Sequence, residues 1–111
     1  MPEEVIPILR VRKAADAVAW YALMGFRQEW EHRYAPGFPA FVSITRGNIR
    51  LFLSEHEGDA RPDTLVYLRV NDVRSIAKEF CVEVQEPPWG TYEIELRDPD
   101  GNRLRIGTPK T

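Results

Sequence analysis

The sequence is poor in the residues that build metal and redox sites. Its 111 residues include one cysteine, Cys81, and two histidines, His32 and His56. A single cysteine excludes an internal disulfide and a cysteine-rich zinc site. No apolar run approaches the roughly 20 residues of a membrane-spanning helix, and the acidic start, residues 1–4, lacks the apolar stretch of a secretory signal. We therefore expect a cytoplasmic protein with no membrane partner.

An excess of basic charge is also missing. Fifteen Lys and Arg stand against seventeen Asp and Glu, which gives a net charge of −2 and a pI near 5.7. Because nucleic-acid binders normally carry a basic excess or a basic stripe, no nucleic-acid partner is expected. The apolar fraction of 43% suffices for a buried core, so the length predicts a single domain over residues 1–111.

The order of the predicted elements repeats once. Strands are predicted at residues 5–11, 26–32, 41–45, 49–54, 65–70, 82–85, 92–96 and 103–106, and helices at 14–23 and 73–80. The polar segment 55–63 is predicted to be a linker between module one, about 4–54, and module two, about 64–108. Leu9-Arg10-Val11 recurs as Leu68-Arg69-Val70, and Gly47-Asn48 recurs as Gly101-Asn102. The prediction is an α+β fold in which two βαβββ modules form a curved, half-open barrel with a cavity.

Six segments carry a family resemblance that covers essentially the whole chain. They are Ile6-Pro7-Ile8-Leu9, Trp20-Tyr21, Met24-Gly25-Phe26, Leu51-Phe52-Leu53-Ser54, Pro88-Trp89-Gly90 and Glu95-Leu96-Arg97-Asp98-Pro99-Asp100-Gly101-Asn102. They resemble the bleomycin-resistance proteins of the vicinal oxygen chelate superfamily. The turn at 98–102 is common throughout that superfamily, whereas Pro-Trp-Gly is more specific to the resistance proteins. The resemblance implies a glyoxalase-like homodimer in which the N-terminal strand crosses to the partner subunit at Pro7.

Enzymes of this superfamily hold a divalent metal at four positions in the cavity. The corresponding residues here are Ile6, Leu65, Arg105 and either Leu51 or Phe52, a one-residue register that the sequence leaves open. None of these side chains binds a divalent cation, and arginine would repel one. We therefore expect no metal, no cofactor and no catalysis. The alternative is a metal-dependent lyase, dioxygenase or thiol transferase of the same superfamily.

The remaining candidates for chemistry have simpler interpretations. His56 lies among acidic residues in the predicted linker, and a solvated loop is the favoured interpretation over a metal cluster. Cys81 stands between Phe80 and Val82, which predicts a small buried apolar side chain. Neither residue is assigned a function.

The resemblance implies that the protein sequesters a bleomycin-type glycopeptide antibiotic without altering it, in clefts at the dimer interface. There, aromatic rings stack on the flat bithiazole, and acidic residues lie near the cationic tail. The candidate ligand-binding residues are Trp30, Tyr34, Phe38, Tyr67, Trp89, Glu93 and Glu95. The pair Glu93 and Glu95 is ordinary surface if its strand face is convex, and an anionic wall if that face is concave. Another flat aromatic or cationic metabolite is the open alternative, since the loop before Pro87 is shorter than in the resistance proteins.

Overall fold

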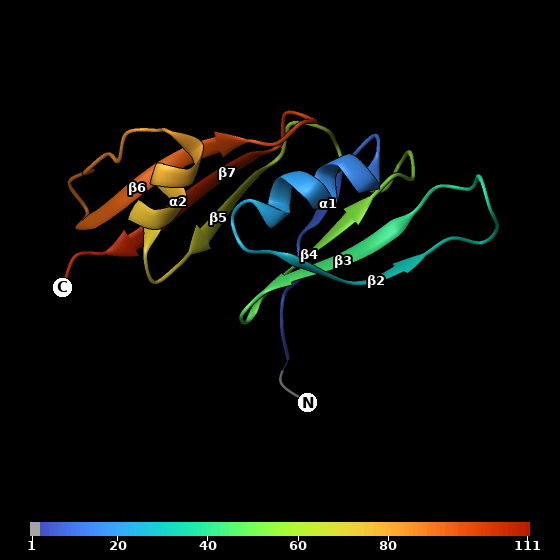
Figure 1. Ribbon diagram of the computed structural model, residues 1–111, viewed down its shortest axis with the longest axis horizontal. Helices are drawn as coiled ribbons and strands as arrows, with labels where there is room; N and C mark the ends of the chain where they lie inside the picture. Colours follow the sequence, from blue (N-terminus) through green and yellow to red (C-terminus); the bar gives the residue numbers. More distant parts are fainter. Residues whose placement is uncertain (1–2) are drawn as a thin grey trace.

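The computed structural model describes residues 3–111 as two small sheets lying side by side, each with one helix (Figure 1). The first sheet has the order β1 (Ile8–Arg10), β4 (Ile49–Ser54), β3 (Phe41–Arg46), β2 (Arg27–His32), and it packs against α1 (Ala14–Ala22). The second has the order β5 (Leu65–Arg69), β7 (Arg103–Pro109), β6 (Thr91–Arg97), and it packs against α2 (Val73–Phe80). In each half the first strand runs parallel to the last. The predicted α+β architecture of repeated halves is confirmed.

One predicted strand, residues 82–85, is wrong. Only Gln85 takes part in strand pairing, through an isolated bridge to Glu93. Its backbone N–H donates to the Glu93 carbonyl at 2.8 Å, and the Glu93 N–H donates back at 2.9 Å. Pro87 and Pro88 follow, and proline has no N–H with which to extend a ladder. The second half is therefore βαββ with one bridge.

Each sheet has a helix-covered face and a face without a helix, which we call the open face. Along β4, Leu51 and Leu53 are fully buried beneath α1, as is Val42 on β3. The buried face of α1 carries Ala14, Ala17 and Tyr21. Phe52 alternates with these leucines and lies on the open face. Within residues 3–111, no helix is long and apolar enough to cross a membrane.

Glu55 of the predicted linker fastens α1 to the first sheet. One of its carboxylate oxygens accepts from the backbone N–H of Ala14 at 2.7 Å, and the other accepts from that of Ala40 at 2.8 Å. Lys13, the N-cap of α1, makes no side-chain capping bond. A carboxylate at a helix N-terminus satisfies an otherwise unpaired donor and complements the helix dipole. Glu55 thus replaces the missing cap.

Cys81 is exposed, and the prediction that it is buried is wrong. The residue ends α2 in the left-handed conformation, with φ 54° and ψ 45°. That conformation turns the chain sharply away from the helix, and in most proteins glycine takes this position. The flanking apolar residues predicted burial, whereas the end of the helix places the thiol at the surface.

Asp98 links the two halves through the turn between β6 and β7. Its carboxylate accepts from the backbone N–H groups of Asp100 and Asn102, each at 2.9 Å, and from the Asn102 side-chain amide at 2.9 Å. The Tyr21 hydroxyl of α1 donates to it at 2.8 Å. Asn102 also donates to the Arg10 carbonyl on β1 at 2.9 Å. Because Asp98, Asn102 and Tyr21 are buried, this network joins the halves away from water.

We predict that Asp98→Ala lowers the free energy of unfolding by about 3 kcal/mol or more, because several buried donors lose a charged acceptor. Urea denaturation monitored by circular dichroism measures the change. The matched control is Arg12→Ala, which removes an ion pair to Asp100 whose arginine side chain is 82% exposed. Such a surface pair contributes about 0–1 kcal/mol. Equal effects from the two substitutions would contradict the assignment of Asp98 as the link.

Candidate functional site

A hollow lies on the second half, beside the loop that precedes β6. It has a volume of about 460 Å³ and is open to solvent. Its lining residues are Gln85, Glu86, Pro87, Trp89, Glu93, Ile94, Glu95 and Arg105. Trp89 is 66% exposed, so most of its ring is free to contact a bound molecule. Three sequence-predicted site residues, Trp89, Glu93 and Glu95, therefore meet in one hollow.

Glu93 on β6 holds the side chains of this site in place. Its Oε2 atom accepts from the Tyr67 hydroxyl at 2.9 Å, from the Trp89 indole N–H at 3.0 Å and from the Thr91 hydroxyl at 3.0 Å. The donors come from β5, from the loop before β6 and from β6 itself. Glu93 is only 6% exposed, so these bonds are shielded from competition with water. We call Glu93 and its three donors the Glu93 cluster.

The second carboxylate oxygen, Oε1, remains available. No described residue donates a hydrogen bond to it, and residues 3–111 contain no side-chain oxygen or nitrogen that is both buried and unpartnered. Oε1 therefore reaches solvent, and Glu93 lines the hollow. A carboxylate oxygen in this position is an acceptor for a ligand's N–H group or cationic group.

The protonation state of Glu93 follows from its surroundings. Burial by itself raises the pKa of the carboxyl, but the bonds from Trp89, Tyr67 and Thr91 and the charge of Arg105 outweigh burial, so the pKa lies below its ordinary value. A lowered carboxyl pKa stabilises the folded protein above the ordinary glutamate range, about pH 4.3. That stabilisation is lost as the pH falls through the lowered pKa. Near neutral pH, Glu93 is an anion.

Glu95 differs from Glu93, although both face the same side of β6. Its carboxylate lies 3.3 Å from Arg105 and 3.7 Å from Arg103, both on β7. Two guanidinium groups thus surround one carboxylate. The open face at this point is a mixed-charge surface, and Glu93 supplies the carboxylate oxygen that is not engaged by a cation.

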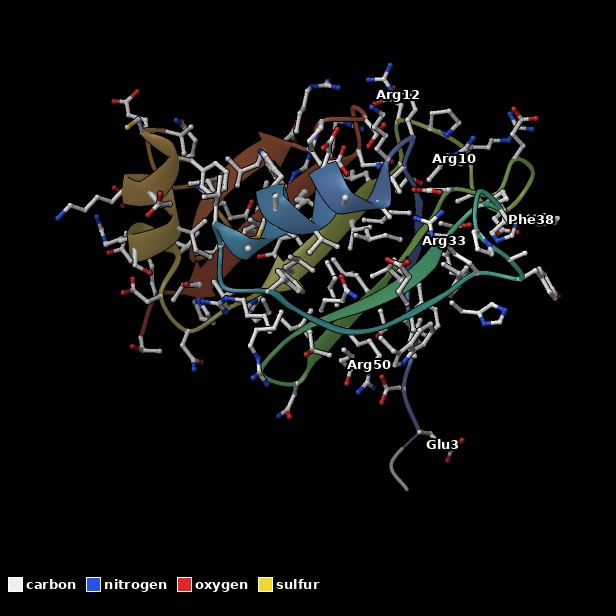
Figure 2. The ribbon with its side chains drawn as sticks, turned by 45° about the vertical axis from the view of Figure 1, so that its right-hand side comes forward. Glu3, Arg10, Arg12, Arg33, Phe38 and Arg50 are labelled. Atoms are coloured by element: carbon white, nitrogen blue, oxygen red, sulfur yellow. The ribbon has the colours of Figure 1, made fainter. Side chains whose placement is uncertain are left out.

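The other sequence-predicted aromatic residues lie on the first half. Trp30 on β2 stacks on Phe41, with ring centroids 6.1 Å apart, and lies 5.5 Å from Phe52. Tyr34 and Phe38 are exposed on the loop between β2 and β3. Figure 2 shows Phe38 at the edge of the molecule opposite α2. A single chain therefore does not bring Trp30, Tyr34 or Phe38 to the hollow beside Trp89.

A charged network beside Trp30 was not singled out as a site in the sequence. Glu29 accepts from the buried Ser43 hydroxyl at 2.6 Å and from two nitrogens of Arg50 at 2.8 and 2.9 Å. Arg50 also donates to Glu4 at 2.6 Å, and its position is labelled in Figure 2. The Arg50 and Ser43 bonds lower the pKa of Glu29 to about 2. The residues come from four separate segments, so no local sequence motif predicts the network.

The expected metal positions bring no ligand set together. Leu65 is exposed, Arg105 is paired with Glu95, and Ile6 is partly buried. Of the two residues that the sequence left open, Leu51 is buried beneath α1 and Phe52 lies on the open face. Among residues 3–111, no group of three or more His, Cys, Asp or Glu side chains is arranged to hold a metal ion.

Solved structures share this fold across nearly their whole length. A bleomycin-binding protein in complex with bleomycin matches with a TM-score of 0.76 and 20% identity, over 98% of this chain and 100% of that one. A bleomycin resistance determinant encoded on transposon Tn5 matches with a TM-score of 0.73 and 22% identity, over 99% and 100%. A lactoylglutathione lyase from Agrobacterium tumefaciens matches with a TM-score of 0.72 and 21% identity, over 97% and 95%.

At these identities the structural matches establish the fold. No curated protein sequence matches this chain significantly. The sequence model described as "Glyoxalase superfamily protein" matches residues 1–111, the entire chain. This protein therefore belongs to the glyoxalase superfamily.

Proposed function

We propose that the protein binds and sequesters a flat small molecule of the bleomycin type without altering it. The observation that carries the proposal is the pairing of Trp89 with Glu93 in the hollow: an exposed ring, fixed by its indole N–H, lies beside an ionised carboxylate with one available oxygen. A flat ligand ring stacks on the tryptophan, and a ligand donor or cation meets the carboxylate. Bleomycin binding by a protein of the same fold supports this choice.

We propose further that the protein acts as a homodimer with its ligand clefts between subunits. Large apolar side chains stand 42–44% exposed on both open faces, namely Ile8 and Trp30 on the first sheet and Leu65 and Tyr67 on the second. Open apolar faces of this kind are typical of protein interfaces. A partner's first sheet set against the hollow would place Trp30, Tyr34 and Phe38 near Trp89, where one chain does not place them.

The N-terminal segment offers a means of strengthening that dimer. In the single chain, β1 runs parallel to β4, and the Pro7 carbonyl accepts from the Phe52 N–H at 2.9 Å. Before β1 the chain extends away from the body of the molecule (Figure 1), and Val5 is 94% exposed. Exchanging this segment between subunits would replace one set of hydrogen bonds by an identical set.

A metal-dependent enzyme is the second candidate, favoured by the likeness to a lactoylglutathione lyase. Such an enzyme needs several neutral or anionic donors converging on one ion. The positions where the superfamily's ligands are expected carry Ile6, Leu65, Arg105 and either Leu51 or Phe52. We therefore place binding first and catalysis second.

We predict that bleomycin binds with micromolar or tighter affinity, with quenching of tryptophan fluorescence and measurable heat in calorimetry. Trp89→Ala should weaken binding about tenfold, because ring stacking contributes about 0.5–1.5 kcal/mol beyond the apolar contact it buries. Leu23→Ala, which truncates an exposed apolar side chain at the end of α1, is the matched control and should bind like the wild type. Absence of both heat and quenching with the wild-type protein would refute the assignment to bleomycin.

We predict a dimer of twice the 12.8 kDa chain mass in sedimentation equilibrium. Ile8→Glu places a charge on the open face of β1 and should raise the dimer dissociation constant at least tenfold, because a desolvated unpaired charge is strongly unfavourable. Leu23→Glu introduces the same charge at an exposed position outside that face and should leave the dimer intact. A wild-type protein that stays monomeric at high micromolar concentration would exclude the dimer.

We predict that protein dialysed against Zn²⁺, Mn²⁺ or Ni²⁺ and then against buffer retains far less than one metal ion per chain. The reason is that the expected ligand positions carry hydrocarbon or cationic side chains. Elemental analysis by mass spectrometry measures the ratio. One firmly bound ion per chain would favour the enzyme over the binding protein.

A further inference from the structure

Gly107 differs from the other glycines in its backbone conformation. The other six glycines, Gly25, Gly37, Gly47, Gly58, Gly90 and Gly101, have positive φ angles, which favour glycine on conformational grounds. Gly107 does not, and it lies within β7, the central strand of its sheet. Glycine inside a strand destabilises it and marks a place where another group approaches the backbone closely. Glycine is therefore needed at position 107 because a side chain there would not fit.

The space over Gly107 is occupied by Tyr67. A Cβ atom at position 107 would lie 2.1 Å from the Tyr67 hydroxyl oxygen and 3.0 Å from Glu93 Cγ. Since β7 lies between β5 and β6, the Tyr67 side chain must cross β7 to donate to Glu93. The register places Gly107 directly opposite Glu93 on β6 and two pairs along from Tyr67 on β5, so that both side chains lie on the same face. Tyr67 passes where a side chain at 107 would stand.

This crossing decides how Glu93 is held. With the Tyr67 hydroxyl present, Oε2 has three donors drawn from β5, β6 and the loop before β6. The same oxygen therefore fixes the ring of Tyr67 and the ring of Trp89, and Oε1 is left without a described donor. Any side chain at position 107 would exclude the hydroxyl from this arrangement.

We propose that Gly107 is the specificity-determining position of this site: its missing side chain lets Tyr67 reach Glu93, and Glu93 thereby presents one oxygen to an N–H-bearing or cationic ligand beside Trp89. Gly107 acts through Tyr67 and is a positioning residue. The proposal rests on the proposed binding function for its ligand, but the arrangement of Tyr67 and Glu93 is measurable without one.

The first experiment uses no ligand. Carbon-13 NMR of the glutamate carboxyls follows the titration of Glu93 in the wild type and in Gly107→Ala, Tyr67→Phe and the double variant. Both single variants remove the Tyr67 bond, so each should raise the pKa of Glu93. The double variant should raise it no further, because the same bond is lost once. The charges facing Glu93 from β7 and β6, Arg105 and Glu95, are unchanged throughout.

The second experiment is a bleomycin-binding cycle by calorimetry. Gly107→Ala should weaken binding at least tenfold in the wild-type background. In the Tyr67→Ala background, where the crossing ring is gone, the same substitution should change affinity less than twofold. If Gly107→Ala weakens binding equally in the two backgrounds, its role is purely structural. That result would overturn the proposal.

The two experiments separate the possible failures. If the wild type does not bind bleomycin, the proposed function fails, whereas the carboxyl titration still decides whether Gly107 positions Tyr67. An unchanged Glu93 pKa in a folded Gly107→Ala protein overturns the positioning role. Should Gly107→Ala alone fail to fold, an unchanged Glu93 pKa in Tyr67→Phe overturns it equally, because that variant keeps the glycine and removes only the hydroxyl.

Discussion

A buried carboxylate, that of Asp98, holds the two halves of this protein in one arrangement. Each half covers one sheet face with its own helix, and the buried apolar side chains of the two halves form one hydrophobic cluster. At the contact between them, the Tyr21 hydroxyl of the first half donates to Asp98 away from water, and Trp20 packs edge-on against Phe80. Removing the Asp98 carboxylate would leave several buried donors without their acceptor, and this penalty makes the arrangement specific. The shared turn at 98–102 is thus an element of architecture rather than of ligand chemistry.

A second carboxylate, that of Glu93, organises the candidate site. Three donors converge on one of its oxygens, which fixes an exposed indole and a phenol relative to each other. The groups present suit recognition: a stacking surface, an ionised acceptor and surrounding arginines. These groups are the basis of the binding function that we propose. In the part of the chain that the structure describes, no group of three or more His, Cys, Asp or Glu side chains is arranged to hold a metal ion.

Much of the architecture follows from local pattern. The sequence patterns predicted both helices, α1 and α2. They also predicted all seven strands, close to their observed bounds. The two wrong predictions have local causes that hydrophobic patterns do not take into account. Pro87 and Pro88 cut short the pairing of 82–85, and the left-handed end of α2 exposes Cys81. For the site, position in the Pro-Trp-Gly loop pointed to Trp89, but nothing local indicated Thr91, Arg103 or Gly107.

The sequence alone determined the α+β class, the internal repeat and the alternation of faces along each strand, because these depend on neighbours within a few residues. Tertiary structure alone decided that Phe52 rather than Leu51 lies on the open face and that Glu95 sits between two arginines. It also decided that Tyr67 crosses Gly107 to reach Glu93. The positions of Glu95 and Tyr67 depend on the order β5, β7, β6 and on its register. That register joins strands that are distant in sequence, so it is defined only in the folded chain.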